Sequence, residues 1–343
     1  MLSLSTTGII GIPLFVILYL IYRRMPKAGS PLFRLGYMLY TRTKVGYFYH
    51  RRELAKARQK YDDGHSVAQM AEFDGLRIIP IPIIMDNYCY LIVDDRTQTG
   101  ILVDPADPDL ILPVLKKESV NIVAVLCTHK HWDHSGGNST FKRLYSNIKI
   151  YGGAVDRAQA VTHPVADGDV LDFSGLKFTV NFTPGHTVGH VVYTLNGAPF
   201  NAPDSLFSGD HLFLAGCGRM FEGSSTTMLR SLDVLCAMKD DTLVWPGHEY
   251  AKDNLEFCLT IEPNNDATMA KKAWVTEQRK NRISTCPSTI GEERRYNVFL
   301  RTGESSIWET LGLDNDTESE RDTIRVKALS LLRQRKDKFK YKL

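Results

Sequence analysis

Three histidines and an aspartate lie within the short string Thr128-His129-Lys130-His131-Trp132-Asp133-His134. Imidazole and carboxylate groups without a thiolate suit Zn²⁺, and also Fe or Mn. His129 and His131 are two residues apart, so an extended backbone places both rings on one side. One metal could take this pair, and a second could take Asp133 and His134. Because the whole chain has only ten histidines, the string predicts a metal site.

Apolar runs of strand length precede this string and three further candidate ligands. Residues 122–127 precede the string, and residues 178–182, 205–208 and 242–245 precede His186, Asp210 and His248 in turn. Such runs predict buried strands, and functional side chains commonly lie on the loops that follow. The four loops supply enough ligands for two ions with water between them: His129, His131, Asp133, His134, His186, Asp210 and His248.

The motifs THKHWDHSGG, TPGHT, SGDHLF, GCGRMFEG and PGHEY occur in this order. They resemble the glyoxalase II (hydroxyacylglutathione hydrolase) branch of the metallo-β-lactamase superfamily over roughly residues 77 to 340. The resemblance implies an α/β fold, an αββα sandwich with a C-terminal helical substrate-binding region. It also implies one metal held by His129, His131 and His186, a second held by Asp133, His134 and His248, a bridging Asp210, and Asp104 as the carboxylate that orients a ligand.

The predicted chemistry is hydrolysis of a thioester. Two divalent ions, most simply Zn, would lower the pKa of a bridging water toward about 7 and make hydroxide available at neutral pH. Asp133 and Asp210 would orient that hydroxide for attack on the carbonyl carbon. A thiolate leaves without a strong general acid, because an ordinary thiol has a pKa near 8.5. The resemblance implies an S-acyl glutathione such as lactoylglutathione as substrate.

Five residues are predicted to bind this substrate by the same resemblance. Arg219, Phe221 and Tyr250 match family positions that contact glutathione, and Arg333 and Lys336 match two basic residues that hold a glycine carboxylate. The chain departs from the family where Arg219 replaces a lysine and Phe221 replaces a tyrosine. Loss of that hydroxyl removes a hydrogen bond of about 0.5 to 1.5 kcal/mol, so altered glutathione recognition is expected. For Arg333 and Lys336 the alternative is a solvated basic helix end.

Two other functions are left open by the sequence. A mononuclear iron persulfide dioxygenase belongs to a related branch that shares an H-x-H-x-D-H string, but that branch generally lacks a long helical C-terminus. A weakly active scaffold at a membrane is the other, and the full set of ligand positions argues against it. The chain has no G-x-S-x-G elbow, Walker P-loop or C-x-x-C pair that would indicate a different mechanism.

The N-terminal residues predict a membrane location. Residues 1–22 carry no charged side chain and as a helix would reach about 33 Å, against a hydrocarbon core of about 30 Å. Lys and Arg follow this run and none precedes it, which favours a single-pass anchor with a cytosolic enzyme over a cleaved signal peptide. Mitochondrial targeting is a further alternative. Eleven basic residues and one Glu between Arg23 and Lys60 predict adhesion to anionic lipid rather than to nucleic acid.

These segments give a predicted domain organisation: a membrane anchor over residues 1–22, a basic juxtamembrane segment over 23–70, the metallo-β-lactamase domain over 71–262 and a helical C-terminal region over 263–343. Helix-forming residues dominate 270–282 and 319–340. The six scattered cysteines predict buried, reduced thiols. His190 is a candidate to support a ligand, His163 and His211 are not expected to bind metal, and His50 and His65 are expected at the surface.

Overall fold

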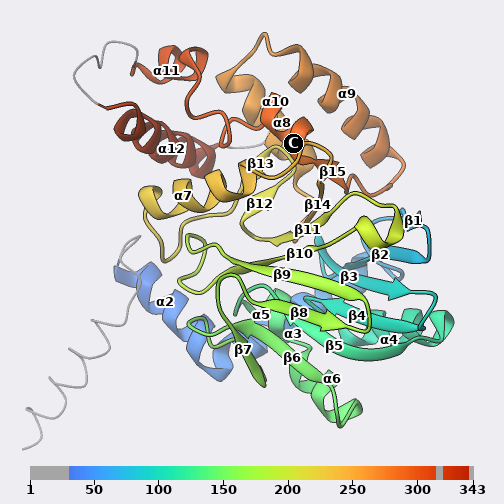
Figure 1. The fold of residues 1–343 in the computed structure, drawn as a ribbon. Helices are drawn as coiled ribbons and strands as arrows, with labels where there is room; N and C mark the ends of the chain where they lie inside the picture. Colours follow the sequence, from blue (N-terminus) through green and yellow to red (C-terminus); the bar gives the residue numbers. More distant parts are fainter. Residues whose placement is uncertain (1–30, 314–319, 340–343) are drawn as a thin grey trace, which may run out of the picture.

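The computed structural model describes residues 31–313 and 320–339 and contains two large β-sheets (Figure 1). The first sheet has the order β1 (Ala71–Phe73), β2 (Leu76–Ile83), β3 (Asn87–Asp94), β4 (Thr99–Val103), β5 (Asn121–Cys127), β6 (Lys149–Gly153) and β7 (His163–Val165). The second has the order β15 (Ser288–Thr289), β14 (Leu243–Pro246), β11 (Ser205–Gly209), β10 (Val191–Leu195), β9 (Leu176–Phe182) and β8 (Val170–Phe173). A short hairpin pairs β12 (Leu212–Phe213) with β13 (Gly216–Cys217).

The two sheets pack face to face around a shared apolar core. Alternate residues of β3 divide between two clusters: Tyr90 and Ile92 join the core between the sheets, and Leu91 and Val93 face the outer helices. Period-two alternation of this kind is expected where both faces of a strand are covered. Tyr193 and Trp245 contribute to the inner core from the second sheet.

Helices cover the outer face of each sheet, which completes the αββα sandwich. The cluster outside the first sheet includes residues of α4 (Pro108–Glu118) and α6 (Asn138–Leu144). The cluster outside the second sheet includes residues of α7 (Ser225–Cys236), α8 (Ala251–Ile261), α9 (Asp266–Lys280), α10 (Ile290–Tyr296), α11 (Ser305–Leu311) and α12 (Arg321–Lys338). In Figure 1 the C-terminal helices gather on one side of the sandwich and α4 and α6 lie on the other. A C-terminal helical region was predicted and is confirmed, whereas the boundary after residue 262 stays a prediction.

The basic N-terminal segment differs from its prediction. It forms α2 (Pro31–Arg42) and α3 (Lys44–Lys60), and α3 buries Leu54 and Ala57 in the cluster outside the first sheet. His50 and His65, predicted to be surface residues, are buried, and their Nε2 atoms lie 3.1 Å from the Ala106 carbonyl and 2.8 Å from the Asn87 carbonyl, respectively. The charge pattern alone was therefore misleading, because the same segment also carries apolar positions that pack on the sheet.

The predicted membrane anchor, residues 1–22, lies outside the described residues. Within residues 31–313 and 320–339, no helix is both long enough and apolar enough to cross a membrane. The six cysteines are free, and all but Cys236 are buried, as predicted.

Candidate metal centre

The candidate ligands meet at one edge of the sandwich because each follows the end of a strand. β5 ends at Cys127, just before His129, and the short helix α5 (Trp132–Ser135) carries Asp133 and His134. β9, β11 and β14 lead to His186, Asp210 and His248 in turn. The close approach requires glycine at position 247, where a Cβ atom would lie 2.6 Å from Oδ1 of Asp210.

One group of donor atoms consists of three imidazoles and a carboxylate. His129 Nε2 and His186 Nε2 lie 2.9 and 3.0 Å from Nδ1 of His131. Asp210 Oδ2 is 3.4 Å from His186 Nε2, and the donor atoms of all four residues lie within 4.8 Å of one another. This spacing is that of side chains that face a common point.

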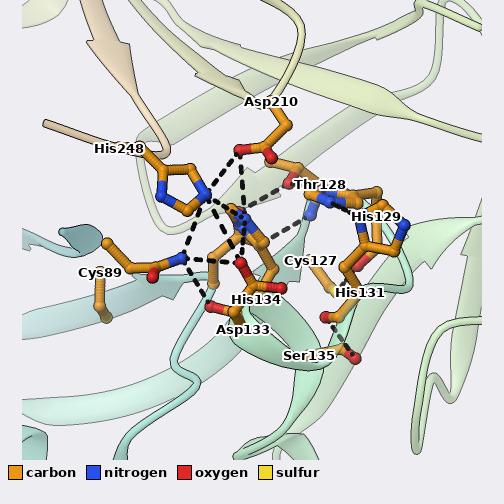
Figure 2. A network of polar contacts seen from close by, with 12 residues as sticks. Cys89, Cys127, Thr128, His129, His131, Asp133, His134, Ser135, Asp210 and His248 are labelled. Atoms are coloured by element: carbon orange, nitrogen blue, oxygen red, sulfur yellow. Dashed lines mark hydrogen bonds and ion pairs between the residues drawn. The ribbon is translucent and has the colours of Figure 1, made fainter. Parts of the chain in front are cut away.

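A second group lies beside the first (Figure 2). The Nε2 atoms of His134 and His248 are 3.3 Å apart, and Oδ2 of Asp133 lies 3.7 and 3.5 Å from them. Oδ1 of Asp210 is 3.2 Å from both Nε2 atoms. Asp210 therefore faces both groups, one oxygen toward each.

The chemistry of these donors fits divalent ions. Oδ1 of Asp210 is buried and has no hydrogen-bond partner among the described residues, although two imidazole nitrogens lie 3.2 Å away. A buried polar atom without a partner is costly, and an ion held by the surrounding nitrogens and carboxylates removes that cost. Histidine and carboxylate oxygen are ligands of Zn²⁺ and also of Fe and Mn.

Hydrogen bonds to the atoms that face away from the centre orient the candidate ligands. Asp104, which was predicted to orient a ligand, has its Oδ2 2.9 Å from Nδ1 of His134 and accepts from the backbone and hydroxyl of Thr128. Asp86 lies 2.7 Å from Nδ1 of His248. Such contacts fix the tautomer and the direction of a ligating imidazole.

The electrostatics of the centre favour a cation. Burial on its own raises the pKa of Asp210, but His248 and His134 outweigh it and hold this pKa well below its usual range. For His248 burial acts to lower the pKa, yet Asp210 and Asp86 raise it to about 10. Burial, with the neighbouring imidazoles, holds the pKa values of His129 and His131 well below the ordinary histidine value. The histidines of the first group are thus neutral and can act as ligands, and the negatively charged carboxylates favour a bound cation.

A cavity of about 810 Å³ opens onto both donor groups. All five predicted substrate residues line it: Arg219, Phe221, Tyr250, Arg333 and Lys336. Arg333 donates to the Cys217 carbonyl and Lys336 to the Asp253 carbonyl, at 2.9 and 3.0 Å. Both side chains belong to residues that are only 7% exposed, so they do not form a solvated helix end. Tyr250 stacks on His248 with 4.7 Å between ring centroids.

Several residues at the centre were not identified from the sequence. Asp86 lies in the turn between β2 and β3, Asn87 is the first residue of β3, and Asn87 donates to Oδ2 of Asp133 at 3.2 Å. Tyr37 and Tyr40 reach the centre from α2, 2.9 Å from His131 and 3.2 Å from Asp133. None of these four has a motif spacing that relates it to the histidine string. The basic segment that contains the two tyrosines was instead interpreted as lipid-binding.

The other histidines are not members of the donor groups. His190 accepts from the Asp210 backbone N–H at 3.3 Å, and its ring stacks on that of His129 with 5.0 Å between centroids. It therefore supports two candidate ligands without facing the centre itself. His211 is buried and His163 is exposed.

Comparisons with known proteins match nearly all of the sandwich and the C-terminal helices. The model of the metallo-β-lactamase superfamily matches residues 85–248, and the model of the hydroxyacylglutathione hydrolase C-terminus matches residues 249–339. The cytoplasmic hydroxyacylglutathione hydrolase of Arabidopsis thaliana is 42% identical over 249 residues, which cover 72% of this chain and 96% of that protein. The crystal structure of ETHE1 from Myxococcus xanthus has a TM-score of 0.50 at 23% identity and covers 78% of this chain and 98% of that one, a similarity of fold.

The predicted single-pass membrane location is wrong. The Arabidopsis relative is named a cytoplasmic protein, and the described part of the chain has no helix suited to cross a bilayer. The basic segment that was predicted to adhere to lipid instead places α2 against the candidate centre through Tyr37 and Tyr40.

Proposed function

The chain belongs to the hydroxyacylglutathione hydrolase family of the metallo-β-lactamase superfamily and is a thioester-hydrolysing enzyme, and from this premise we propose that it is a dinuclear metal-dependent thioesterase that acts on an S-acyl glutathione such as lactoylglutathione. One observation carries the proposal. Two donor groups share Asp210 at a cavity that also holds two buried cationic side chains, Arg333 and Lys336.

In this proposal each donor group holds one ion. His129, His131 and His186 would hold the first, Asp133, His134 and His248 would hold the second, and Asp210 would bridge both. Zinc is the most fitting ion for these donors, and Fe or Mn would also suit them. Asp104 and Asp86 orient His134 and His248 through hydrogen bonds of 2.9 and 2.7 Å.

The residues around the centre have distinct tasks in hydrolysis. When bound, the ions supply a nucleophile at neutral pH and polarise the carbonyl oxygen of the thioester. Asp133 and Asp210 accept hydrogen bonds from the attacking water and so direct it at the carbonyl carbon. Asp133 is itself held by Asn87 and Tyr40, each at 3.2 Å, so its direction is fixed before substrate binds. The thiolate product needs no strong acid, because thiol pKa values lie near 8.5.

Recognition of glutathione is assigned to residues that line the cavity beside the two donor groups. Arg333 and Lys336 provide two positive charges for a substrate carboxylate, and Arg219 and Tyr250 border the same space. Phe221, which lacks the hydroxyl found in the family, packs its ring on Tyr37 with 5.1 Å between centroids. The loss of the hydroxyl is thus accompanied by an aromatic contact with α2.

The dioxygenase alternative has less support from the residues that border the cavity. The C-terminal helix α12 contributes Arg333 and Lys336 to the cavity. Two cationic side chains suit the carboxylates of a glutathione thioester. A single iron does not account for the second donor group, in which His134 and His248 lie 3.3 Å apart.

The direct test measures metal content and activity on one sample of the full chain. We expect about two divalent ions per chain and turnover of lactoylglutathione that is lost after treatment with a chelator and restored by zinc. Acyl thioesters of coenzyme A serve as comparison substrates. One iron per chain with oxygen consumption on a persulfide, and no hydrolysis, would assign the dioxygenase activity instead.

The role of Lys336 predicts a pH dependence of KM. Burial and the adjacent Arg333 lower the pKa of Lys336 to about 8, so its positive charge is present below pH 8 and is lost as the pH rises through that value. KM for lactoylglutathione should therefore rise above pH 8, by roughly tenfold near pH 9, where about a tenth of the side chain stays protonated. Initial rates corrected for spontaneous hydrolysis give the profile.

The control for this profile is an acyl thioester of N-acetylcysteamine, which carries no carboxylate. Its KM should stay constant over the same range. An equal rise for both thioesters would show that the pH effect does not come from recognition of a carboxylate, and Lys336 would be removed from the substrate site.

A further inference from the structure

The N-terminal helices are built into the wall of the metal centre. The indole N–H of Trp132 donates to the Tyr40 carbonyl at 2.9 Å, and the side chain of Arg58 donates to Asp107 at 2.7 Å. α2 and α3 meet Trp132 so closely that a Cβ atom at Gly46 would collide with its indole ring. The helix pair is therefore fixed to Trp132, which lies between His131 and Asp133 in the chain.

Each imidazole of the first donor group has a partner on its outward nitrogen. Nδ1 of His129 lies 3.1 Å from the Thr128 hydroxyl, and Nδ1 of His186 lies 2.9 Å from the Arg219 carbonyl. His131 is reversed: its Nδ1 faces the other two rings, and its outward Nε2 lies 2.9 Å from the hydroxyl of Tyr37. Of these three partners, only the last comes from the N-terminal helices.

The second donor group has the same arrangement at Asp133. Its Oδ2 faces His134 and His248, and its Oδ1 accepts from the hydroxyl of Tyr40 at 3.2 Å. Tyr37 and Tyr40 are three residues apart in α2, so both side chains leave the same face of the helix. One helical face thus contacts one candidate ligand of each ion.

We propose that Tyr37 and Tyr40 are positioning residues for the metal centre, Tyr37 through His131 Nε2 and Tyr40 through Asp133 Oδ1. Partners of this kind fix the ring orientation and the basicity of a ligand, and their loss typically weakens metal binding by 10 to 100-fold. The family models match residues 85–339 and do not include α2, so this support is added by the chain's own N-terminal segment. The inference rests on the proposed ligand assignment but not on the identity of the thioester.

An alternative role for α2 is contact with substrate alone. Phe33 and Tyr37 stack on Phe221 with 6.0 and 5.1 Å between ring centroids, and all three rings line the cavity. Replacement of tyrosine by phenylalanine keeps this aromatic wall and removes only the hydroxyl. The variants Tyr37→Phe and Tyr40→Phe therefore separate support of a ligand from packing.

The test measures zinc affinity of the metal-free full chain by competition with a chromophoric chelator. We expect Tyr37→Phe and Tyr40→Phe each to weaken one of the two zinc sites by about tenfold or more, and the double variant to weaken both. The visible spectrum of the Co²⁺-substituted protein should change in each variant, because the orientation of a ligand changes. Tyr145→Phe, whose ring stacks on Phe141 in the outer layer away from the centre, is the matched control and should leave affinity and spectrum unchanged.

The outcomes separate this inference from the proposed function. Affinities and Co²⁺ spectra of both single variants equal to those of Tyr145→Phe would overturn the positioning role, even if the enzyme hydrolyses lactoylglutathione. Weakened zinc binding in the variants of a chain that hydrolyses no glutathione thioester would keep the positioning role and reject the substrate.

Discussion

Replacement of Asp210 by alanine is expected to lower kcat/KM by about 10³-fold or more and to reduce the metal content below two ions per chain. The two oxygens of Asp210 lie 3.2 to 3.4 Å from nitrogens of three histidines, His134, His248 and His186. The carboxylate is therefore the negative charge shared by both donor groups. Loss of several kcal/mol of charge stabilisation in the transition state corresponds to a factor of this size.

Metal analysis and steady-state kinetics on the same preparation check this expectation. Asp322→Asn is the matched control, because the Asp322 side chain is 87% exposed and belongs to α12. That variant should keep its metal and its rate. If Asp210→Ala retains two ions and at least a tenth of the activity, Asp210 does not bridge the centre.

Replacement of Glu293 by alanine is expected to lower the free energy of unfolding by about 3 to 5 kcal/mol. The carboxylate of Glu293 is fully buried and accepts four hydrogen bonds. The donors are the Ala215 N–H, the Ser288 and Tyr296 hydroxyls and the Asn297 amide, at 2.7 to 2.9 Å. Alanine leaves the Ala215 N–H and the two hydroxyls buried without this acceptor, whereas the Asn297 amide keeps the Phe213 and Gly216 carbonyls.

Chemical denaturation of the unmodified chain and of Glu293→Ala gives the difference in the free energy of unfolding. Glu293→Gln should lose less, because its amide oxygen can still accept from part of this set, and Glu309→Ala, on the exposed side of α11, should change stability by less than about 0.5 kcal/mol. A loss below about 1 kcal/mol in Glu293→Ala would show that the four donors find other partners or water. Ala215 directly precedes β13, and Cys217 of β13 lines the cavity. We therefore also expect Glu293→Ala to lose part of its activity at denaturant concentrations near its unfolding transition.

The sequence was sufficient to predict those strands and helices that a local residue pattern determines. The apolar runs before His129, Asp210 and His248 formed strands β5, β11 and β14, and a turn at each strand end brought the side chain to one edge. The same logic predicted the C-terminal helices, since Leu329 and Leu332 recur on a buried face of α12. Strand ends and helix faces depend on neighbours in the chain, so their signals are present in a single sequence.

Long-range contacts were beyond that reasoning. Tyr37 and His131 are 94 positions apart, and Asp86 and His248 are 162 apart. No spacing relates such partners before the two sheets have packed. The basic residues around Tyr37 were interpreted as a lipid-binding surface. A helix that packs on the protein and exposes its charged face to solvent has the same residue composition as one whose charged face contacts a membrane. Burial of Leu54 and Ala57 shows that the helix pair packs on the sheet, which composition alone did not indicate.

The placement of α2 changes how substitutions in this chain are to be interpreted. Residues 31–60 precede the part matched by the family models, which begins at residue 85, so an interpretation based on the matched part alone would class changes there as peripheral. Tyr37, Tyr40 and Gly46 nevertheless contact His131, Asp133 and Trp132. We therefore expect substitutions at these three positions to affect the metal centre, although both family models leave them out.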